Sequence, residues 1–378
     1  MHIAFLTSEY PHSKTSSSAG IGTSIKNLAK QLVIQNHQVT VFVYSQDKTE
    51  TFNDEGITIQ KIAYKKYKIL GWLLYRKYIQ NFINKIITKE SIDIIEAPDW
   101  TGITAFMKLR CPLIIRLHGT DAYFCNLEGR KQKAKNFFFE KLALKSANCI
   151  VSVSAFTAGK TKEIFKLSKP IQVIYNGIDT SLFRPLEISV EIDTILYFGT
   201  IIRKKGVLEL AHIFNKVIEK NPNVQLKLLG KDVIDVQSGK STLSIFSSIL
   251  SDGAKKSMRH INNVPYNEVK NYLAKANVVV LPSYAEAFPM TWLEAMAMEK
   301  AIVTSNIGWA SELMLEGKTG FMVHPENHDE YSSKIIQLLK SHDLSIRLGK
   351  QARQRIVENF AHDKITLDNV EYYKSVIA

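Results

Sequence analysis

Short apolar runs alternate with stretches of helical periodicity along the first part of the chain. Apolar runs of strand length stand at residues 3–6, 39–43, 92–95 and 113–117, and a helical pattern covers about residues 22–35. Alternation of this kind predicts a parallel sheet that helices cover on both faces. The chain is therefore expected to be an α/β protein.

A second series of strand, loop and helix begins at about residue 194, after a turn at residues 176–179. With 378 residues, the chain is long enough for two domains with full hydrophobic cores. We expect a first domain at residues 1–185 and a second at 186–361. A last helix at 362–378 is expected to return to the first domain.

The most informative stretch is residues 278–304. It opens with a continuous apolar run at 278–281, which is typical of a buried parallel strand. After a loop, Pro289 stands where a first helical residue would, because its missing N–H costs nothing there. Apolar residues then repeat at helical spacing, and a second buried strand is predicted at 301–303.

Two carboxylates bracket the start of this predicted helix. Glu286 lies in the loop just before it, and Glu294 lies inside it. Backbone amides near Phe288 and Met290, with the positive end of the helix dipole, make a site for an anion or for sugar hydroxyls. Carboxylates beside such amides suit a ligand that carries both a diphosphate and neutral hydroxyls. A nucleotide sugar is such a ligand.

The simpler interpretation is an amphipathic helix with two solvated glutamates. Residues 282–297, PSYAEAFPMTWLEAMA, however resemble the E-x7-E signature of retaining glycosyltransferases of the GT-B fold, family 4. The resemblance implies two Rossmann-like domains with parallel sheets that face an interdomain cleft. It also implies that Glu286 contacts the donor sugar as a catalytic residue and that Glu294 holds the ribose. The chain departs from the family pattern at Ala287 and Glu299, where glycine is usual.

A glycine-containing loop at residues 16–24 is predicted between the first strand and its helix. Its Gly20 and Gly22 do not have the spacing of the dinucleotide-binding fingerprint, and a flexible turn is the simpler interpretation. In the family that the chain resembles, the equivalent loop approaches the donor phosphates. Gly20 and Gly22 are therefore donor-binding candidates by resemblance.

A second glycine loop, residues 199–206, precedes a predicted helix in the second domain. Lys205 is placed at the helix start, where a lysine can pair with a diphosphate. It also matches the lysine of the family. Thr200 stands where the family has arginine, so Arg203 or Lys204 is the candidate to replace that arginine.

Two predicted strands of the first domain end in polar side chains. Asp99 follows one of them, and His118 and Asp121 follow the run at residues 113–117. Side chains at the carboxyl ends of parallel strands line the binding crevice in this architecture. By resemblance to the HG-x-D element of the family, His118 reaches the transferred sugar. Asp99 and Asp121 are acceptor-side candidates.

Basic residues gather in the first half of the chain. Residues 1–185 hold 26 Lys and Arg against 14 Asp and Glu, whereas residues 186–378 hold 23 against 22. Most of the formal net charge of +13 therefore belongs to one domain, which indicates an anionic partner.

Residues 61–89 carry eight of these basic residues and no acidic one, interleaved with aromatic residues. We interpret this stretch as a helix with basic groups on one side and apolar groups on the other, which suits an anionic membrane surface. A second basic and aromatic cluster lies at residues 130–141. A solvated amphipathic helix and a nucleic-acid-binding helix are the alternatives.

No apolar run is long enough to span a membrane, and the first residues form a strand pattern rather than a signal peptide. Cys111, Cys125 and Cys149 have neither disulfide nor metal spacing. We expect a cytoplasmic protein, associated peripherally with the inner face of the cell membrane. The chain has no Asp-x-Asp pair, with which the other large glycosyltransferase fold binds a divalent metal. No metal or other cofactor is expected.

The resemblance implies transfer of a sugar, with retention, from a nucleotide-sugar donor to a glycan or lipid-linked acceptor, in the synthesis of a cell-surface polysaccharide or glycolipid. One alternative is a nucleotide-sugar epimerase or phosphorylase of the same fold, which would need no basic membrane face. Another is a non-catalytic protein that binds polyanions such as nucleic acid. A polyanion site gains nothing from two carboxylates, so nucleic acid is not the expected partner.

Overall fold

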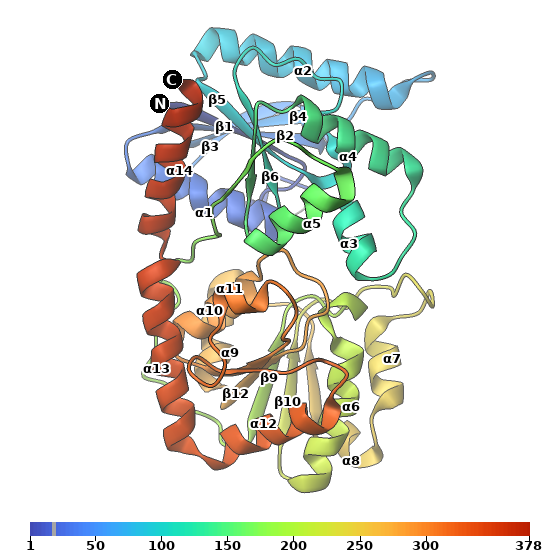
Figure 1. Ribbon diagram of the computed structural model, residues 1–378, viewed down its shortest axis with the longest axis vertical. Coiled ribbons are helices and arrows are strands. Elements are labelled where there is room, and N and C mark those ends of the chain that lie inside the picture. The colour runs from blue at the N-terminus through green and yellow to red at the C-terminus, as the bar shows by residue number, and fades with distance from the viewer. Residues whose placement is uncertain (17–19) are drawn as a thin grey trace. The chain divides into compact units, whose positions relative to one another are not determined.

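The computed structural model describes residues 1–16 and 20–378. The chain forms two compact units, each with its own sheet, which Figure 1 shows as ribbons. The first unit consists of Met1–Gly177 and His362–Ala378, and the second of Ile178–Ala361. The division falls at residue 177, earlier in the chain than the boundary at residue 185 drawn from the sequence.

The described residues of the first unit contain a sheet with the strand order β3-β4-β2-β1-β5-β6-β7-β8. Neighbouring strands are parallel except for β3 and β4, which are antiparallel. The strands are β1 (His2–Thr7), β2 (Gln38–Gln46), β3 (Glu50–Asp54), β4 (Ile57–Ala63), β5 (Ile94–Pro98), β6 (Leu113–Leu117), β7 (Cys149–Ser152) and β8 (Ile171–Val173). The helices are α1 (Gly20–Ile34), α2 (Gly71–Glu90), η1 (Trp100–Gly102), α3 (Asp121–Leu127), α4 (Ala134–Ser146), α5 (Ala155–Phe165) and α14 (His362–Ile377).

Helices cover both faces of this sheet, as the sequence predicted. Alternate side chains of β1 point to opposite faces, because the side-chain period of a strand is two. Ala4 and Leu6 enter a core that also takes residues of α2, α4 and α5. Ile3 and Phe5 enter a second core, built with residues of α1 and α14. The segment at residues 362–378 is therefore part of the hydrophobic core of the first unit.

In the described residues of the second unit, a parallel sheet has the order β11-β10-β9-β12-β13-β14. Its strands are β9 (Thr194–Phe198), β10 (Gln225–Leu229), β11 (Met258–Ile261), β12 (Val278–Leu281), β13 (Ala301–Thr304) and β14 (Phe321–Met322). Its helices are η2 (Arg203–Lys205), α6 (Val207–Lys220), α7 (Thr242–Ile249), α8 (Asp252–Lys256), η3 (Tyr266–Glu268), α9 (Val269–Lys275), α10 (Met290–Ala297), α11 (Ala310–Leu313), α12 (His328–Lys340) and α13 (His342–Asn359). The expected pair of α/β domains with parallel sheets is confirmed.

The basic stretch at residues 61–89 is not one helix, contrary to the sequence interpretation. Residues 61–63 end strand β4, a connection follows, and α2 begins only at Gly71. The aromatic residues of α2 do not form an exposed apolar side either. Tyr75 is buried, and Trp72, Tyr78 and Phe82 pack against the core of the first unit. The apolar face of α2 is thus buried against the sheet that it covers.

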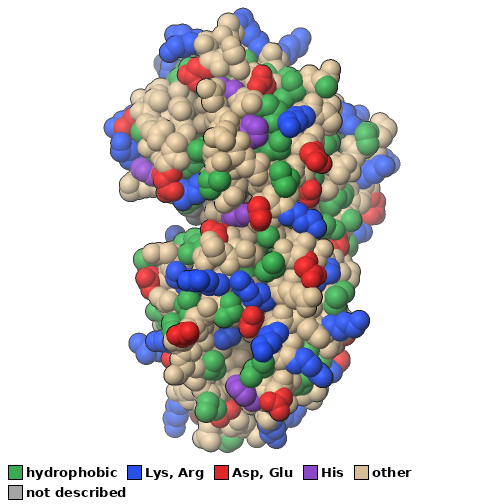
Figure 2. All heavy atoms as spheres, turned by 90° about the vertical axis from the view of Figure 1, so that its left-hand side faces the viewer, with side chains coloured by type: hydrophobic (Ala, Val, Ile, Leu, Met, Phe, Trp, Pro, Cys, Tyr) green, Lys and Arg blue, Asp and Glu red, His purple; other side chains and the backbone are tan. Residues whose placement is uncertain are grey.

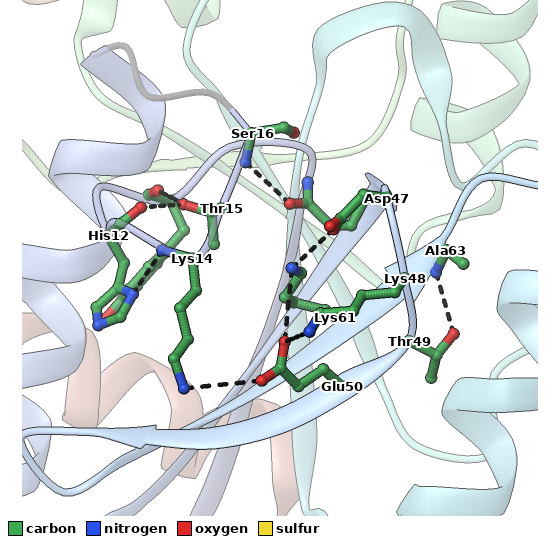
Figure 3. A network of polar contacts seen from close by, with 12 residues as sticks. His12, Lys14, Thr15, Ser16, Asp47, Lys48, Thr49, Glu50, Lys61 and Ala63 are labelled. Atoms are coloured by element: carbon green, nitrogen blue, oxygen red, sulfur yellow. Dashed lines mark hydrogen bonds and ion pairs between the residues drawn. The ribbon is translucent and has the colours of Figure 1, made fainter.

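Lys61, the first basic residue of that stretch, has its side chain only 2% exposed. Its ammonium pairs with Asp47 at 2.8 Å and with Glu50 at 3.7 Å. Figure 3 shows this network, in which Lys61 of β4 points at the turn between β2 and β3. Lys61 is therefore a structural ion-pair partner and is not available to a membrane surface.

The predicted loop at residues 16–24 lies partly outside the described residues, which resume at Gly20. Helix α1 begins at Gly20, two residues before the predicted start at about residue 22, so Gly20 is helical rather than part of the loop. A Cβ atom on Gly22 would stand 2.9 Å from the carbonyl oxygen of Glu9, whereas one on Gly20 would meet nothing within 4 Å. Glycine at 22 thus allows α1 to approach the segment after β1.

A buried ion pair joins α14 to the sheet of the first unit. The guanidinium of Arg116 in β6 donates to both carboxylate oxygens of Glu96 in β5, at 2.7 and 2.9 Å. The hydroxyl of Tyr373 in α14 donates to Glu96 at 2.7 Å, and Arg116 donates to Asn369. Burial alone would raise the pKa of Glu96, but the adjacent Arg116 outweighs it, so the pKa is lowered. Glu96 is therefore a buried carboxylate with a full set of partners.

We expect substitution of Arg116 by Met to destabilise the protein by about 3–5 kcal/mol, because it leaves the buried Glu96 carboxylate without its counter-charge. Tyr373→Phe should cost about 1.5–3 kcal/mol, since it removes one hydrogen bond to a charged group. Urea unfolding followed by circular dichroism measures both. Glu371→Gln, on the exposed side of α14, is the control. Equal stability of all three variants would contradict the role of the ion pair.

Candidate active site

The strand order of the second sheet places its loops. From β9 the chain moves outward to β10 and β11, and it then returns to the other side of β9 to form β12, β13 and β14. The carboxyl ends of β9 and β12 are thus a topological switch point, where the loops after the two strands diverge and leave a crevice. The loop at residues 199–206 follows β9, and the loop at 282–289 follows β12. Both had been singled out in the sequence.

These two loops are in close contact. Gly206 has a φ of 68°, and a Cβ atom there would lie 1.7 Å from the carbonyl oxygen of Pro282. No side chain fits between them, so only glycine allows this approach. The backbone amides of Tyr284 and Ala285 donate to the carbonyl of Lys204 at 2.9 and 3.2 Å. The glycine loop is thereby fixed against the loop that carries Glu286.

As a result, Lys205 and Glu286 meet. The Lys205 Nζ lies 2.9 Å from Oε1 of Glu286, and the side chains are 20% and 13% exposed. The hydroxyl of Ser283 donates to the same carboxylate at 3.0 Å. The structure therefore brings together the cation and the carboxylate that the sequence had placed at a diphosphate and at a sugar.

Helix α10 begins at Met290, and Pro289 is its N-cap rather than its first residue, which corrects the prediction by one position. Pro289 has an extended ψ of 113°, and its carbonyl accepts from the amides of Trp292 and Leu293 at 3.2 and 3.4 Å. The side chain of Phe288 is buried and packs against Phe360, with ring centroids 5.6 Å apart. Phe288 and Met290 therefore contribute backbone at the positive end of a helix, where amides face outward along the axis.

Glu294 is buried in α10, with 5% of its surface exposed. The hydroxyl of Tyr266 donates to Oε1 of Glu294 at 2.8 Å. Burial raises the pKa of Glu294 from 4.5 to about 7, although the hydrogen bond from Tyr266 and the charge of Lys205 oppose the rise. Burying a carboxyl group in this way costs folding free energy, and pKa values perturbed by burial are typical of functional sites. Tyr266 and Glu294 are 28 residues apart in the chain, so no local pattern indicated this bond.

Arg203 forms a different contact from the one predicted. Its guanidinium donates to both oxygens of Asp235 at 2.9 and 2.8 Å. The hydrogen bonds from Arg203 lower the pKa of Asp235 despite its burial. Asp235 lies in the connection after β10, so this pair links two loops at the carboxyl edge of the sheet. Arg203 thus has a structural partner in this structure, whereas Lys205 points to the carboxylate of the signature.

In the first unit, His118 follows β6 and is half-buried. Burial, and then the neighbouring Arg116, lower the pKa of His118 to about 4, so the imidazole is neutral at neutral pH. The backbone amide of His118 donates to Oδ1 of Asp99 at 3.0 Å. Asp99 is 1% exposed, and burial raises its pKa to about 8. Asp99 therefore holds the turn at His118 from inside the first unit.

Asp121 opens α3 and accepts from Asn136 at 3.1 Å and from Cys125 at 3.6 Å. The buried Glu140 of α4 accepts the backbone amides of Asp121 and Ala122 at 2.9 and 3.2 Å. Burial raises the pKa of Glu140. The Glu140 carboxylate thereby fixes the start of α3, just after His118. The sequence analysis missed it, because the residues around Glu140 do not indicate that its side chain caps another helix.

His118 also lines a cavity within the first unit. Ser24 and Asn27 of α1, Glu96, Asn176 and His362 contribute to the same wall. The hydroxyl of Ser24 donates to Asn176 at 3.1 Å. The cavity has a volume of about 20 Å³, which is room for a water molecule that could exchange hydrogen bonds with the neutral imidazole.

Among the residues that the structure describes, no group of three His, Cys, Asp or Glu side chains is arranged to hold a metal ion. The charged groups at the switch point of the second sheet are instead Lys205, Glu286 and Glu294. A cation and helix amides can stabilise a diphosphate, while carboxylates accept hydrogen bonds from hydroxyls. The candidate site thus has, within the second unit, groups that can bind a diphosphate and groups that can accept hydrogen bonds from hydroxyls.

Comparison with known proteins identifies relatives along nearly the whole chain. An uncharacterised glycosyltransferase of Methanocaldococcus jannaschii is 24% identical over 366 residues, which is 94% of this chain and 95% of that protein. The N-acetyl-alpha-D-glucosaminyl L-malate synthase of Bacillus anthracis is 22% identical over 380 residues, 95% and 94% of the two chains.

Solved structures show the same fold. The sucrose-phosphate synthase of Thermosynechococcus elongatus superposes with a TM-score of 0.82 over 99% of this chain and 98% of the other, at 18% identity. The Anabaena protein HepE, solved in complex with UDP and glucose, has a TM-score of 0.74 at 18% identity, over 99% and 100% of the two chains.

Two family models match adjoining parts of the sequence. The model of glycosyltransferase family 4 matches residues 18–182, and the model of glycosyl transferases group 1 matches residues 179–355. Together the two models account for most of both units. The chain belongs to the glycosyl transferases group 1, and it is a glycosyltransferase with the two-domain fold of that family.

Proposed function

We propose that this glycosyltransferase moves a sugar from a nucleoside diphosphate sugar to a glycan or lipid-linked acceptor, with retention of configuration and without a metal ion. The observation that carries the proposal is the Lys205–Glu286 ion pair at the switch point of the second sheet, beside the start of α10 and the buried Glu294. A diphosphate requires the cation and the amides, and a sugar and ribose require the carboxylates.

The names of relatives support this choice of donor and reaction. HepE was solved with UDP and glucose, and the Bacillus anthracis relative is named for joining a glucosaminyl group to malate. A relative in Mycolicibacterium smegmatis is an alpha-maltose-1-phosphate synthase, 26% identical over 329 residues. We take a UDP-sugar as the first donor to test.

In the proposed reaction, Lys205 and the amides at the start of α10 stabilise the negative charge of the departing diphosphate, as pre-placed electrostatic groups. The sugar becomes oxocarbenium-like as the bond to phosphate lengthens. The acceptor hydroxyl attacks from the face that the diphosphate leaves, and its proton passes to the departing phosphate oxygen. Glu286 and the neutral imidazole of His118 hold sugar hydroxyls, and neither forms a covalent bond.

We also propose that the acceptor is membrane-linked and that the enzyme acts at the inner face of the cell membrane, in the synthesis of a cell-surface polysaccharide or glycolipid. The charge distribution supports this, since residues 1–185 contain 26 basic and 14 acidic residues. Among the described residues, no helix is both long and apolar enough to cross a bilayer.

Donor binding is tested first by thermal unfolding with UDP-, GDP- and ADP-sugars in the presence of EDTA. Ligand at about 100 times its Kd stabilises the folded state by roughly 2.7 kcal/mol, which raises the unfolding temperature measurably. We expect a shift with one nucleotide series, and its loss in Glu294→Ala.

The matched control is Glu219→Ala, since Glu219 is an exposed glutamate of the same unit. It should keep the full shift. A shift that appears only when Mg²⁺ is added would contradict the metal-free proposal. No shift with any donor would contradict the donor site itself.

The pH dependence of donor binding should follow Glu294. A carboxylate accepts two ribose hydroxyls better than a carboxylic acid does, and the pKa of Glu294 is about 7. Donor affinity is therefore expected to fall by up to about tenfold for each pH unit below 7. Titration calorimetry between pH 5.5 and pH 8.5, the range set by that pKa, measures it.

Glu294→Gln should bind donor weakly and show no such pH dependence.

The stability of the parent protein should change in the opposite direction from its donor affinity as the pH rises. A carboxyl with a raised pKa loses stability as the pH rises from 4.5 through about 7, because the ionised form is disfavoured inside. At pH 8, above that pKa, Glu294→Gln should be at least as stable as the parent. A parent protein whose donor affinity is constant over this range would contradict the assignment.

Glu286→Ala should lower turnover by about 10²–10³-fold with the fold intact, since the side chain is at the rim of the site and acts on the sugar. Release of nucleoside diphosphate, with water or an added acceptor, measures turnover, and proton NMR of the product gives its configuration. Glu219→Ala is again the control. Unchanged turnover in Glu286→Ala, or an inverted product from the parent protein, would overturn the mechanism.

A further inference from the structure

The connection between β4 and α2 exposes a cluster of apolar side chains. Tyr64 is 61% exposed, Ile69 76%, Leu70 53%, and Leu74 in the first turn of α2 41%. Single exposed apolar residues are normal on a protein surface, but a group of this size within one short segment indicates an interaction site. These residues are not the face of α2 that packs on the sheet.

Another exposed apolar side chain, that of Phe138 near the start of α4, is connected to this cluster through ring contacts. The rings of Phe138 and Phe106 are 6.3 Å apart, and those of Phe106 and Trp72 are 5.4 Å apart. Trp72 is the second residue of α2 and stands two positions after Leu70 in the chain. In Figure 1, α2 and α4 both begin on the right-hand side, which agrees with these contacts. The two segments therefore form one surface.

Lysines surround the apolar side chains, and this set of residues is called the lysine–apolar surface below. Six exposed lysines belong to it: Lys65, Lys66, Lys68, Lys131, Lys133 and Lys135. No Asp or Glu occurs at residues 61–89 or at 129–139. The two segments that form the surface thus contribute only positive charge around an apolar centre, unlike the buried Lys61, which has carboxylate partners.

Another face of the molecule looks different. In the view of Figure 2, Lys and Arg side chains are interspersed with Asp and Glu side chains. The exposed lysines at 65–68 and 131–135 are grouped instead, and they adjoin the exposed aliphatic side chains.

We propose that the lysine–apolar surface docks on an anionic lipid bilayer. Its lysines meet the headgroups, and Ile69, Leu70 and Phe138 enter the boundary between headgroups and acyl chains. An acidic glycan or a nucleic acid would use the lysines but would gain nothing from exposed Ile and Leu side chains. The apolar centre therefore decides in favour of lipid.

This inference deepens the proposed action at the membrane, and it is independent of the proposed chemistry at the donor site. All residues of the surface lie in the first unit, and Lys205, Glu286 and Glu294 lie in the second. Bilayer binding can thus fail while donor binding succeeds, and the reverse.

The test is co-sedimentation of the whole protein with vesicles of phosphatidylglycerol and phosphatidylcholine, and with vesicles of phosphatidylcholine alone. We expect binding to the anionic vesicles only, weakened by salt because the headgroup contacts are screened. The double variant Ile69→Ser, Leu70→Ser should bind at least about tenfold more weakly. The double variant Lys66→Gln, Lys68→Gln should bind roughly 30-fold more weakly.

The control is Lys85→Gln, Lys89→Gln, which removes the same charge from two exposed lysines at the other end of α2. At 1.5 Å of rise per residue, Lys85 and Lys89 lie about 21 and 27 Å along the helix axis from Gly71, where α2 begins, so binding should be nearly unchanged. Thermal unfolding checks that every variant is folded. The inference is overturned if the parent protein does not bind anionic vesicles, if Ile69→Ser, Leu70→Ser binds as well as the parent, or if the control loses as much as Lys66→Gln, Lys68→Gln. It is also overturned if soluble polyphosphate binds tightly while vesicles do not.

Discussion

The candidate site depends on the contact between Gly206 and the carbonyl of Pro282. A Cβ atom at 206 would stand 1.7 Å from that oxygen, so the loops after β9 and β12 can approach only if this residue is glycine. The approach lets Lys204 accept two backbone hydrogen bonds from the opposite loop. It also sets Lys205 at 2.9 Å from Glu286. A parallel sheet supplies the place, but this close backbone contact determines which side chains meet there.

Two buried carboxyl groups show how stability and function diverge in this chain. Glu294 and Asp99 both have raised pKa values because burial penalises their charged forms. Asp99 accepts the amide of His118 and, with a pKa of about 8, is neutral at pH 7, so it serves the backbone without a buried charge. Glu294 titrates near neutral pH beside Tyr266 and Lys205, where a ligand hydroxyl can replace lost water. The other residues from Trp292 to Ala297 in α10 are buried apolar side chains, which hold the helix in place around Glu294.

Charge in the first unit has two separate uses. Arg116, Lys61 and Arg76 are buried basic residues that hold strands and helices together through carboxylates or carbonyl groups. The six exposed lysines of the lysine–apolar surface account for much of the excess charge instead. Composition alone does not separate these two groups, since a buried lysine and an exposed one count equally toward net charge.

The sequence by itself determined the layers of the fold, because strand and helix periodicities are local and the apolar runs at 113–117 and 278–281 coincide with β6 and β12. It also determined the order of Glu286 and Glu294 around one helix, since both belong to a single short motif. Helix ends were less certain. Pro289 proved to be an N-cap, and α1 starts at Gly20, as neighbouring turns compete with small energy differences.

Only the tertiary structure decided which distant residues become partners. The pairs of Lys205 with Glu286, Arg203 with Asp235, and Tyr266 with Glu294 each join separate loops and helices, so no local pattern predicts them. The same holds for the basic stretch at 61–89, whose periodicity suggested one amphipathic helix. Packing against the sheet buries most of its aromatic side chains, and the exposed apolar residues are in the connection before α2 and in the first turn of that helix. A local pattern specifies which side of an element is apolar, but the neighbours that cover that side are set by the whole fold.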